Sequence, residues 1–202
     1  MQKTVILCCC FLLLGGSTVF TQAALTHPLN ISLFNNATLL PGAGELGVFG
    51  IPVHPGLRIG TAFVWREKEK SEWFQTVQLG YFYHQYVHHA IQLYTETGYR
   101  YHFAPHWDAE GLIGLGYLHA IPATPSFKLQ EGQYKKLGSL GRPQLMGGAT
   151  LGLGYNLRPE LRVFLQSQFY IQVPFVREYV PVLPNIAFHM GISLPITIKN
   201  KP

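Results

Sequence analysis

The chain has 202 residues, enough for one sizeable domain, and a formal net charge of +5. Only 12% of its residues are charged, whereas soluble domains usually carry about a quarter, and 13% are aromatic. No basic run interleaved with aromatic residues occurs, which argues against nucleic acid as a partner, and the 21 glycines favour a β-protein that does not face water everywhere.

The amino-terminal 23 residues have the order of regions typical of a cleaved signal peptide. A single lysine precedes an apolar run at 4–14, and Thr21 and Ala23 stand at the −3 and −1 positions of a signal-peptidase site. The apolar run is shorter than the ~20 residues of a spanning helix, so a retained anchor is the weaker interpretation. The cysteines all lie at 8–10, so the expected mature chain has no disulfide and no cysteine-ligated metal.

Runs of alternating hydrophobic and polar residues recur from residue 45 onward, between turn signals rich in Gly, Pro or mixed charges. Residues 24–44 are therefore expected to lead into a folded domain at 45–198. The eight expected strands are 45–53, 57–66, 73–84, 89–103, 108–121, 144–157, 164–175 and 185–196. Two long connections, 122–143 and 173–184, are expected between the later strands.

The seventh run shows the alternation most clearly. One face of this run carries the apolar residues Val163, Leu165, Phe169 and Ile171. The other face carries Arg162, Gln166, Gln168, Tyr170 and Gln172. Period two predicts a strand but does not say which face is buried. Because the runs hold almost no lysine, the apolar face is expected to meet lipid and the polar face to line a lumen. A soluble, lipocalin-like ligand-binding barrel, with the faces reversed, is the alternative.

Eight strands of this kind predict an all-β fold, an eight-stranded antiparallel up-and-down transmembrane β-barrel after a cleaved signal peptide. Such barrels keep their short turns on the periplasmic side. If the two long connections are extracellular, the turns at 66–72, 104–107 and 157–160 and both chain ends become periplasmic.

Several stretches resemble a group of small outer-membrane β-barrel proteins of Bacteroidetes-type bacteria. They are "WFQTVQLGYFYHQYVHHAIQLYTETGYRYHF", "IGLGYLHAIPAT", "LGRPQ" and "PVLPNIAFHMGISLP", within a likeness that runs from about residue 54 to 195. The resemblance implies a location in the outer membrane of a Gram-negative bacterium and insertion by the barrel-insertion machinery, and it implies no reaction. One departure is that the chain continues through "TIKNKP" instead of finishing on an aromatic residue.

Polar residues in the middle of the strands are the main candidate site. They are expected to form a packed polar network in the lumen, made of Arg58, Gln78, Glu96, Arg100, Arg162, Gln166, Gln168 and His189. Glu96 and Arg100 lie four apart on one strand, roughly 13 Å by strand rise, so each is expected to pair with a neighbouring strand, with Arg58, Arg162 and the glutamines as candidate partners. Buried charges are tolerated only when paired and hydrogen-bonded, and the network is therefore expected to stiffen the barrel.

Two other interpretations are weaker. His84, His88 and His89 lie near one turn and could bind zinc or copper, but no carboxylate or cysteine accompanies them, so no metal or cofactor is predicted. His189 and Ser193 with Glu96 or Arg100 could be arranged as in a lipid A deacylase, yet all are expected to point inward. An outer-membrane lipid-modifying enzyme therefore remains only an alternative.

The loop at 122–143 is the best candidate for binding outside the membrane. Lys128, Tyr134, Lys135 and Lys136 could contact lipopolysaccharide phosphates, and a simple solvated loop is the alternative. The sequence thus predicts an integral outer-membrane barrel with a structural or surface-binding role. Its expected partners are outer-membrane lipids, lipopolysaccharide and the insertion machinery, and the sequence leaves its oligomeric state open.

Overall fold

The computed structural model describes residues 26–39, 53–84, 88–123, 127–130, 133–136, 141–175 and 181–197. The strands in this part of the chain are β1 (Thr26–Thr38), β2 (Pro55–Lys68), β3 (Ser71–His84), β4 (His88–His102), β5 (Trp107–Pro122), β6 (Phe127–Gln130), β7 (Gln133–Lys136), β8 (Arg142–Arg158), β9 (Leu161–Val173) and β10 (Leu183–Thr197).

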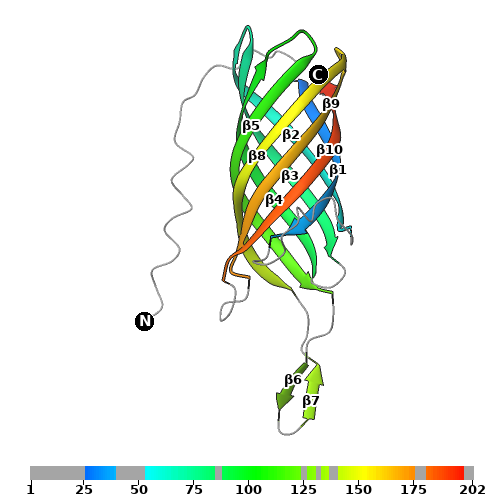
Figure 1. Ribbon diagram of the computed structural model, residues 1–202, viewed down its shortest axis with the longest axis vertical. Coiled ribbons are helices and arrows are strands. Elements are labelled where there is room, and N and C mark those ends of the chain that lie inside the picture. Colours follow the sequence, from blue (N-terminus) through cyan, green and yellow to red (C-terminus); the bar gives the residue numbers. More distant parts are fainter. Residues whose placement is uncertain are drawn as a thin grey trace, which may run out of the picture. The chain divides into compact units, whose positions relative to one another are not determined.

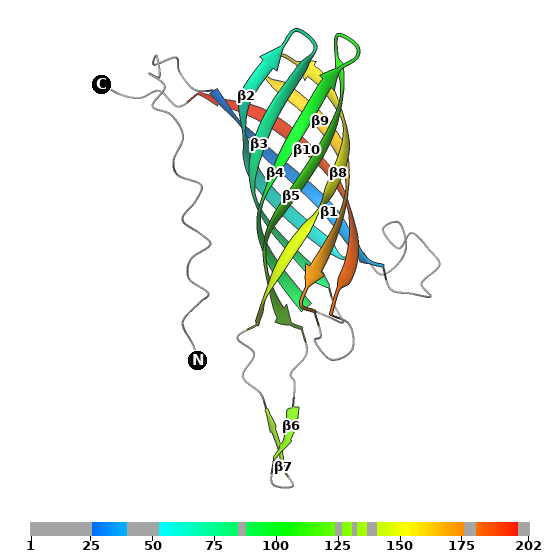
Figure 2. The same ribbon diagram turned by 90° about the vertical axis from the view of Figure 1, so that its left-hand side faces the viewer.

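Eight of these strands close into a barrel in the order β1-β10-β9-β8-β5-β4-β3-β2, as Figures 1 and 2 show. β6 and β7 pair only with each other, in the connection between β5 and β8. Every barrel pairing with a described register is antiparallel, and hydrogen bonds such as that from Leu39 N to Pro184 O, 2.9 Å, join the first strand to the last. The predicted eight-stranded antiparallel up-and-down barrel is confirmed.

No helix long and apolar enough to cross a membrane occurs among the described residues.

The position of the first strand differs from the prediction. The sequence placed it at 45–53 and treated 24–44 as a segment outside the barrel, whereas β1 occupies Thr26–Thr38 and pairs with β2. Asparagine is depleted in strands, so the Asn-rich sequence of this segment does not predict a strand. In the barrel, Asn36 is buried and accepts a hydrogen bond from the Tyr170 hydroxyl at 2.8 Å, which removes the penalty for placing an amide in a strand. Residues 45–52 and the predicted signal peptide at 1–23 lie outside the described residues.

The two faces of the barrel wall have opposite chemistry. Leu151 on the outer face is 72% exposed, whereas the adjacent Thr150 is fully buried inside. The seventh predicted strand is β9, where Leu165, Phe169 and Ile171 are exposed while the three glutamines are buried, as predicted. The hydrophobic residues therefore cover the outside of the closed barrel, the reverse of the pattern in a soluble one.

Aromatic residues gather at both ends of the outer face. At the end with the short turns, the Trp73 ring lies 6.0 Å from that of Trp65 and 5.1 Å from that of Tyr99. At the opposite end, the rings of Tyr81 and Tyr83 lie 6.2 and 4.7 Å from His89. An apolar band between two aromatic girdles is the outer surface of a membrane-spanning barrel.

Inward-facing glycines make the lumen wide enough for its large polar residues. A Cβ atom on Gly114 would come within 2.5 Å of Cγ of Glu96, and one on Gly148 within 2.7 Å of Cβ of Tyr170. Both glycines pair directly with each other across β5 and β8. The missing side chains on this part of the wall leave the space that Glu96 and Tyr170 occupy.

Candidate functional site

A cluster of five charged residues fills the lumen near the short turns. It contains two arginines and three carboxylates: Arg100, Arg162, Glu72, Asp108 and Glu110. Arg162 donates to both oxygens of Asp108, at 2.9 and 2.5 Å, and its guanidinium lies 3.1 Å from Glu110. Arg100 donates to Glu110 at 2.8 Å and also to Glu72. This charge cluster comes from β3, β4, β5 and β9, so it ties four strands together.

The arginines of the charge cluster also pack against aromatic rings. The Arg100 guanidinium carbon lies 4.6 Å from the centre of the Phe74 ring, and that of Arg162 lies 5.6 Å from the centre of Phe164. Stacking of this kind stabilises a weakly hydrated guanidinium away from water. The rings therefore hold the two cations in place while the carboxylates neutralise them.

Arg58 continues the polar network toward the middle of the barrel. Its side chain is buried and donates to the Ser32 hydroxyl at 2.9 Å, to Gln166 Oε1 at 2.5 Å and to the Tyr94 hydroxyl at 3.4 Å. The amide nitrogen of Gln166 in turn donates to Glu110 at 2.7 Å. An unbroken set of hydrogen bonds thus joins Arg58 on β2 to the charge cluster.

Glu96 is buried in the same region, with a different set of partners. Its carboxylate accepts hydrogen bonds from Gln78 Nε2 at 2.8 Å, Thr150 Oγ1 at 2.7 Å and Gln168 Nε2 at 3.3 Å. It makes no ion pair within the part of the chain that the structure describes. Of the partners that the sequence suggested for Glu96, the structure brings the glutamines into contact and not an arginine.

Polar side chains at the other end of the lumen are less completely paired. His189 is fully buried and stacks on Phe34 with ring centres 4.6 Å apart, and neither of its ring nitrogens has a hydrogen-bond partner. Gln172 is also buried with both amide atoms unpaired. The barrel is therefore strongly cross-linked at one end and more weakly at the other.

Two small cavities lie between the side chains of the network. A cavity of about 20 Å³ lies beside Arg58, Arg100 and Arg162, and one of about 10 Å³ lies beside Glu96 and Tyr170. A water molecule requires roughly 10–15 Å³ of such volume. Each cavity is therefore on the scale of a single water molecule.

The structure does not bring the three candidate metal-binding histidines together. His84 and His88 face the inside, where His84 stacks on His54 with ring centres 3.6 Å apart. His89 faces the outside and hydrogen-bonds the Tyr81 hydroxyl at 2.7 Å. Among the described residues, no group of three or more metal-binding side chains is arranged to hold an ion.

The candidate catalytic residues are not assembled either. His189 and Ser193 lie four apart on one strand, roughly 13 Å by strand rise, and Glu96 contacts Gln78, Thr150 and Gln168 instead.

The candidate residues for binding outside the membrane lie in the hairpin between β5 and β8. Lys128 lies in β6, and Tyr134, Lys135 and Lys136 lie in β7. In this hairpin Lys128 is the main-chain partner of Lys135.

The sequence interpretation missed the three carboxylates of the charge cluster. Glu72 stands in a charged turn, and the glycine-rich run around Asp108 and Glu110 obscured which residues share a face. A usable signal was the spacing: Asp108, Glu110 and Leu112 alternate with smaller residues, and all three are buried. Their period of two places both carboxylates in the lumen.

Comparisons with known proteins concern the fold. No family model matches the chain, and no curated protein matches its sequence. Ail, the attachment invasion locus protein of Yersinia pestis, is 11% identical, with 85% of this chain and 98% of that chain covered and a TM-score of 0.50. Neisserial surface protein A is 10% identical, with 85% and 96% covered and a TM-score of 0.49, and the outer membrane enzyme PagL is 13% identical, with 83% and 99% covered and a TM-score of 0.46.

The chain has the fold of the small eight-stranded outer-membrane barrels. The outer face of the barrel also requires a membrane around it, because a continuous apolar surface between aromatic girdles is stable only in contact with lipid. The protein is an integral outer-membrane β-barrel.

Proposed function

We propose that this protein is a sealed outer-membrane barrel that acts through its extracellular segments and does not conduct solutes. The observation that carries the proposal is the hydrogen-bonded path from Arg58 through Gln166 and Glu110 to Arg100 and Arg162, which crosses the lumen. An eight-stranded barrel is just wide enough for side chains to fill it, and the two small cavities support a filled interior. The lumen network then serves to keep the wall rigid.

The lengths of the connections support one orientation. The connections at 69–70, 103–106 and 159–160 are short, whereas three of the four at the other end, 39–54, 123–141 and 174–182, are long and one, 85–87, is short. Short turns face the periplasm in barrels of this type. In this orientation the β6–β7 hairpin is extracellular. Assignment to the Bacteroidetes-type group and insertion by the barrel-insertion machinery belong to the same proposal.

A conductance measurement tests whether the lumen is sealed. Purified protein in a planar lipid bilayer should give no steady channel current, because Arg58 and Gln166 bridge the lumen. The double variant Arg58→Ala/Gln166→Ala removes that bridge and should conduct more than the wild-type protein. A steady wild-type current that this double variant leaves unchanged would contradict the sealed lumen.

The lysines of the hairpin are the proposed contact with lipopolysaccharide. Lys128, Lys135 and Lys136 place three positive charges in two short paired strands, and phosphates attract such charges in a salt-dependent way. Changing all three to glutamate should weaken binding of the reconstituted protein to lipopolysaccharide, as followed by surface plasmon resonance at low salt. The control Lys68→Glu/Lys70→Glu, at the opposite end, is compared with Lys135→Glu/Lys136→Glu, which makes the same change of charge in the hairpin, and the control should leave binding unchanged. Equal binding by both variants would identify the hairpin as an ordinary solvated loop.

A further inference from the structure

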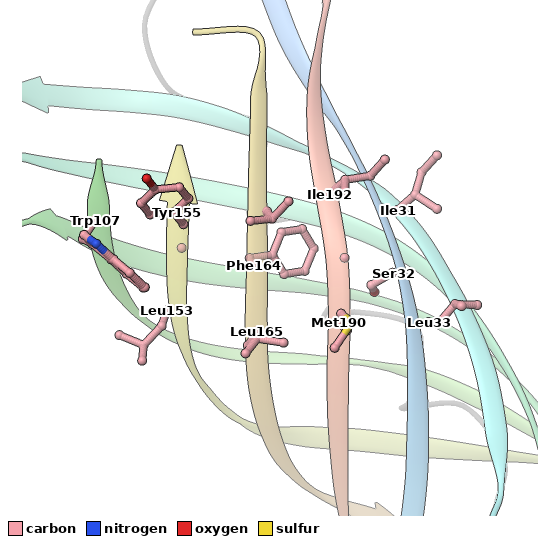
Figure 3. A pocket seen from close by; sticks show the side chains of 13 residues that line it. Ile31, Ser32, Leu33, Trp107, Leu153, Tyr155, Phe164, Leu165, Met190 and Ile192 are labelled. Atoms are coloured by element: carbon pink, nitrogen blue, oxygen red, sulfur yellow. The ribbon is translucent and has the colours of Figure 1, made fainter. Parts of the chain in front are cut away.

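A wide groove runs over the outer wall of the barrel across β8, β9, β10 and β1, with Trp107 of β5 at its edge (Figure 3). Its volume is about 770 Å³. The exposed side chains around it are apolar or aromatic, and include Leu153, Leu165, Met190 and Leu33. It is far larger than either of the two cavities inside the lumen.

The groove exists because a short side chain lies between larger ones. Val163 on β9 pairs with Tyr155 on β8 and with Ile192 on β10. Both of these neighbours have longer side chains, so the Val163 side chain forms the floor of the groove. The lining also includes residues whose side chains are buried, such as Ser32 on β1 and Phe164 on β9, and these present little side chain to the outer surface. The groove is therefore formed by a small side chain on the outer face that lies between larger ones.

We propose that this groove holds one acyl tail of a phospholipid as a bound ligand. The proposal goes beyond the proposed function and rests only on the lipid-facing wall of the barrel. The groove lies within the apolar band, so hydrocarbon is the chemistry that surrounds it. By the measure in which one water molecule requires roughly 10–15 Å³, the groove at about 770 Å³ is tens of times larger than a water-sized space, which is enough for a chain of methylene groups.

The walls of the groove explain why one tail would be retained more strongly than the lipids around it. A tail against a smooth wall touches protein on one side, whereas a tail in the groove also touches Trp107 and Tyr155 on one flank and Ile31 and Leu33 on the other. Each added contact between carbon atoms contributes dispersion energy, and the contributions accumulate along the tail. The two aromatic rings, whose centres lie 4.8 Å apart, form a rigid flank because they pack against each other.

Native mass spectrometry tests the site directly. The full protein in detergent is mixed with palmitoyl-oleoyl phosphatidylethanolamine, and the species that keep lipid after the detergent is stripped are counted. The wild-type protein should retain one phospholipid. Val163→Trp fills the groove and should lose that bound phospholipid. Val77→Trp makes the same change at a 45% exposed position on β3, outside the groove, and should retain it.

Heat-modifiable gel mobility shows whether each variant is a folded barrel, and Ile192→Trp fills the groove from the neighbouring strand if Val163→Trp does not fold. A wild-type protein that retains no phospholipid, or equal retention by the folded groove-filling variant and Val77→Trp, would overturn the proposal. So would a wild-type dimer that Val163→Trp converts to monomer, because a second copy would then occupy the groove. Failure of the sealed lumen appears separately as a bilayer current, and lipid retention does not depend on that result.

Discussion

Arg162→Met should lower the free energy of unfolding by ~3–5 kcal/mol, because it leaves buried carboxylates with too little positive charge. The Asp108 side chain is fully buried, and Glu110 is almost so. Both would then depend on Arg100 alone, which lies 3.6 Å from Asp108 and already contacts Glu72. Urea-induced unfolding from lipid vesicles, followed by tryptophan fluorescence, measures the change.

Two further variants separate the buried ion pair from a general effect of losing an arginine. Arg158→Met removes the same charge at the exposed β8–β9 turn and should change stability by no more than about 0.5 kcal/mol. Adding Asp108→Asn to Arg162→Met removes one of the stranded charges and should restore part of the loss, giving a coupling energy of roughly 0.5–3 kcal/mol. Equal effects of Arg162→Met and Arg158→Met would show that the cluster does not stabilise the barrel.

The faces of the strands could be predicted from the sequence because one physical rule governs every strand of a membrane barrel. Leu165 and Gln166 differ in polarity, and alternation with period two assigns them to opposite sides. The absence of lysine from most strands then indicated that the polar face lines the lumen and the apolar face meets lipid. The same reasoning placed Arg58, Glu96 and Gln168 on the lumen side, where the structure has them.

The partners of those residues could not be predicted, because they depend on the register between strands. Glu96 lies opposite Gly114 on β5 and Thr76 on β3, and this pairing decides that Thr150 and Gln78 reach its carboxylate. The alternation of polar and apolar residues restricts that register only to shifts of two residues and does not select one of them. The first strand was missed for a related reason, since Asn36 is compatible with a strand only when Tyr170 and its other lumen partners are known.

An arginine in the middle of the lipid-facing surface should destabilise the barrel strongly. Leu151 lies near the centre of β8 and is 72% exposed, so Leu151→Arg places a charge close to the middle of the apolar band. The expected loss is ~2–4 kcal/mol, because the guanidinium leaves water for hydrocarbon. The same urea unfolding from vesicles measures this loss, and a smaller inserted fraction on heat-modifiable gels should accompany it.

The depth of the substitution, and not the change of leucine to arginine, is the decisive variable. Leu157 lies on the same strand six residues away, roughly 20 Å by strand rise, at the end with the short turns, and it is 54% exposed. Leu157→Arg can place its charge in the headgroup region and should lower stability by only ~0–1 kcal/mol. The difference in unfolding free energy between the two variants therefore shows whether the outer face of β8 lies in hydrocarbon. If Leu151→Arg and Leu157→Arg were equally stable in vesicles, the outer face of β8 would not lie in lipid, and the barrel would not span the membrane in this way.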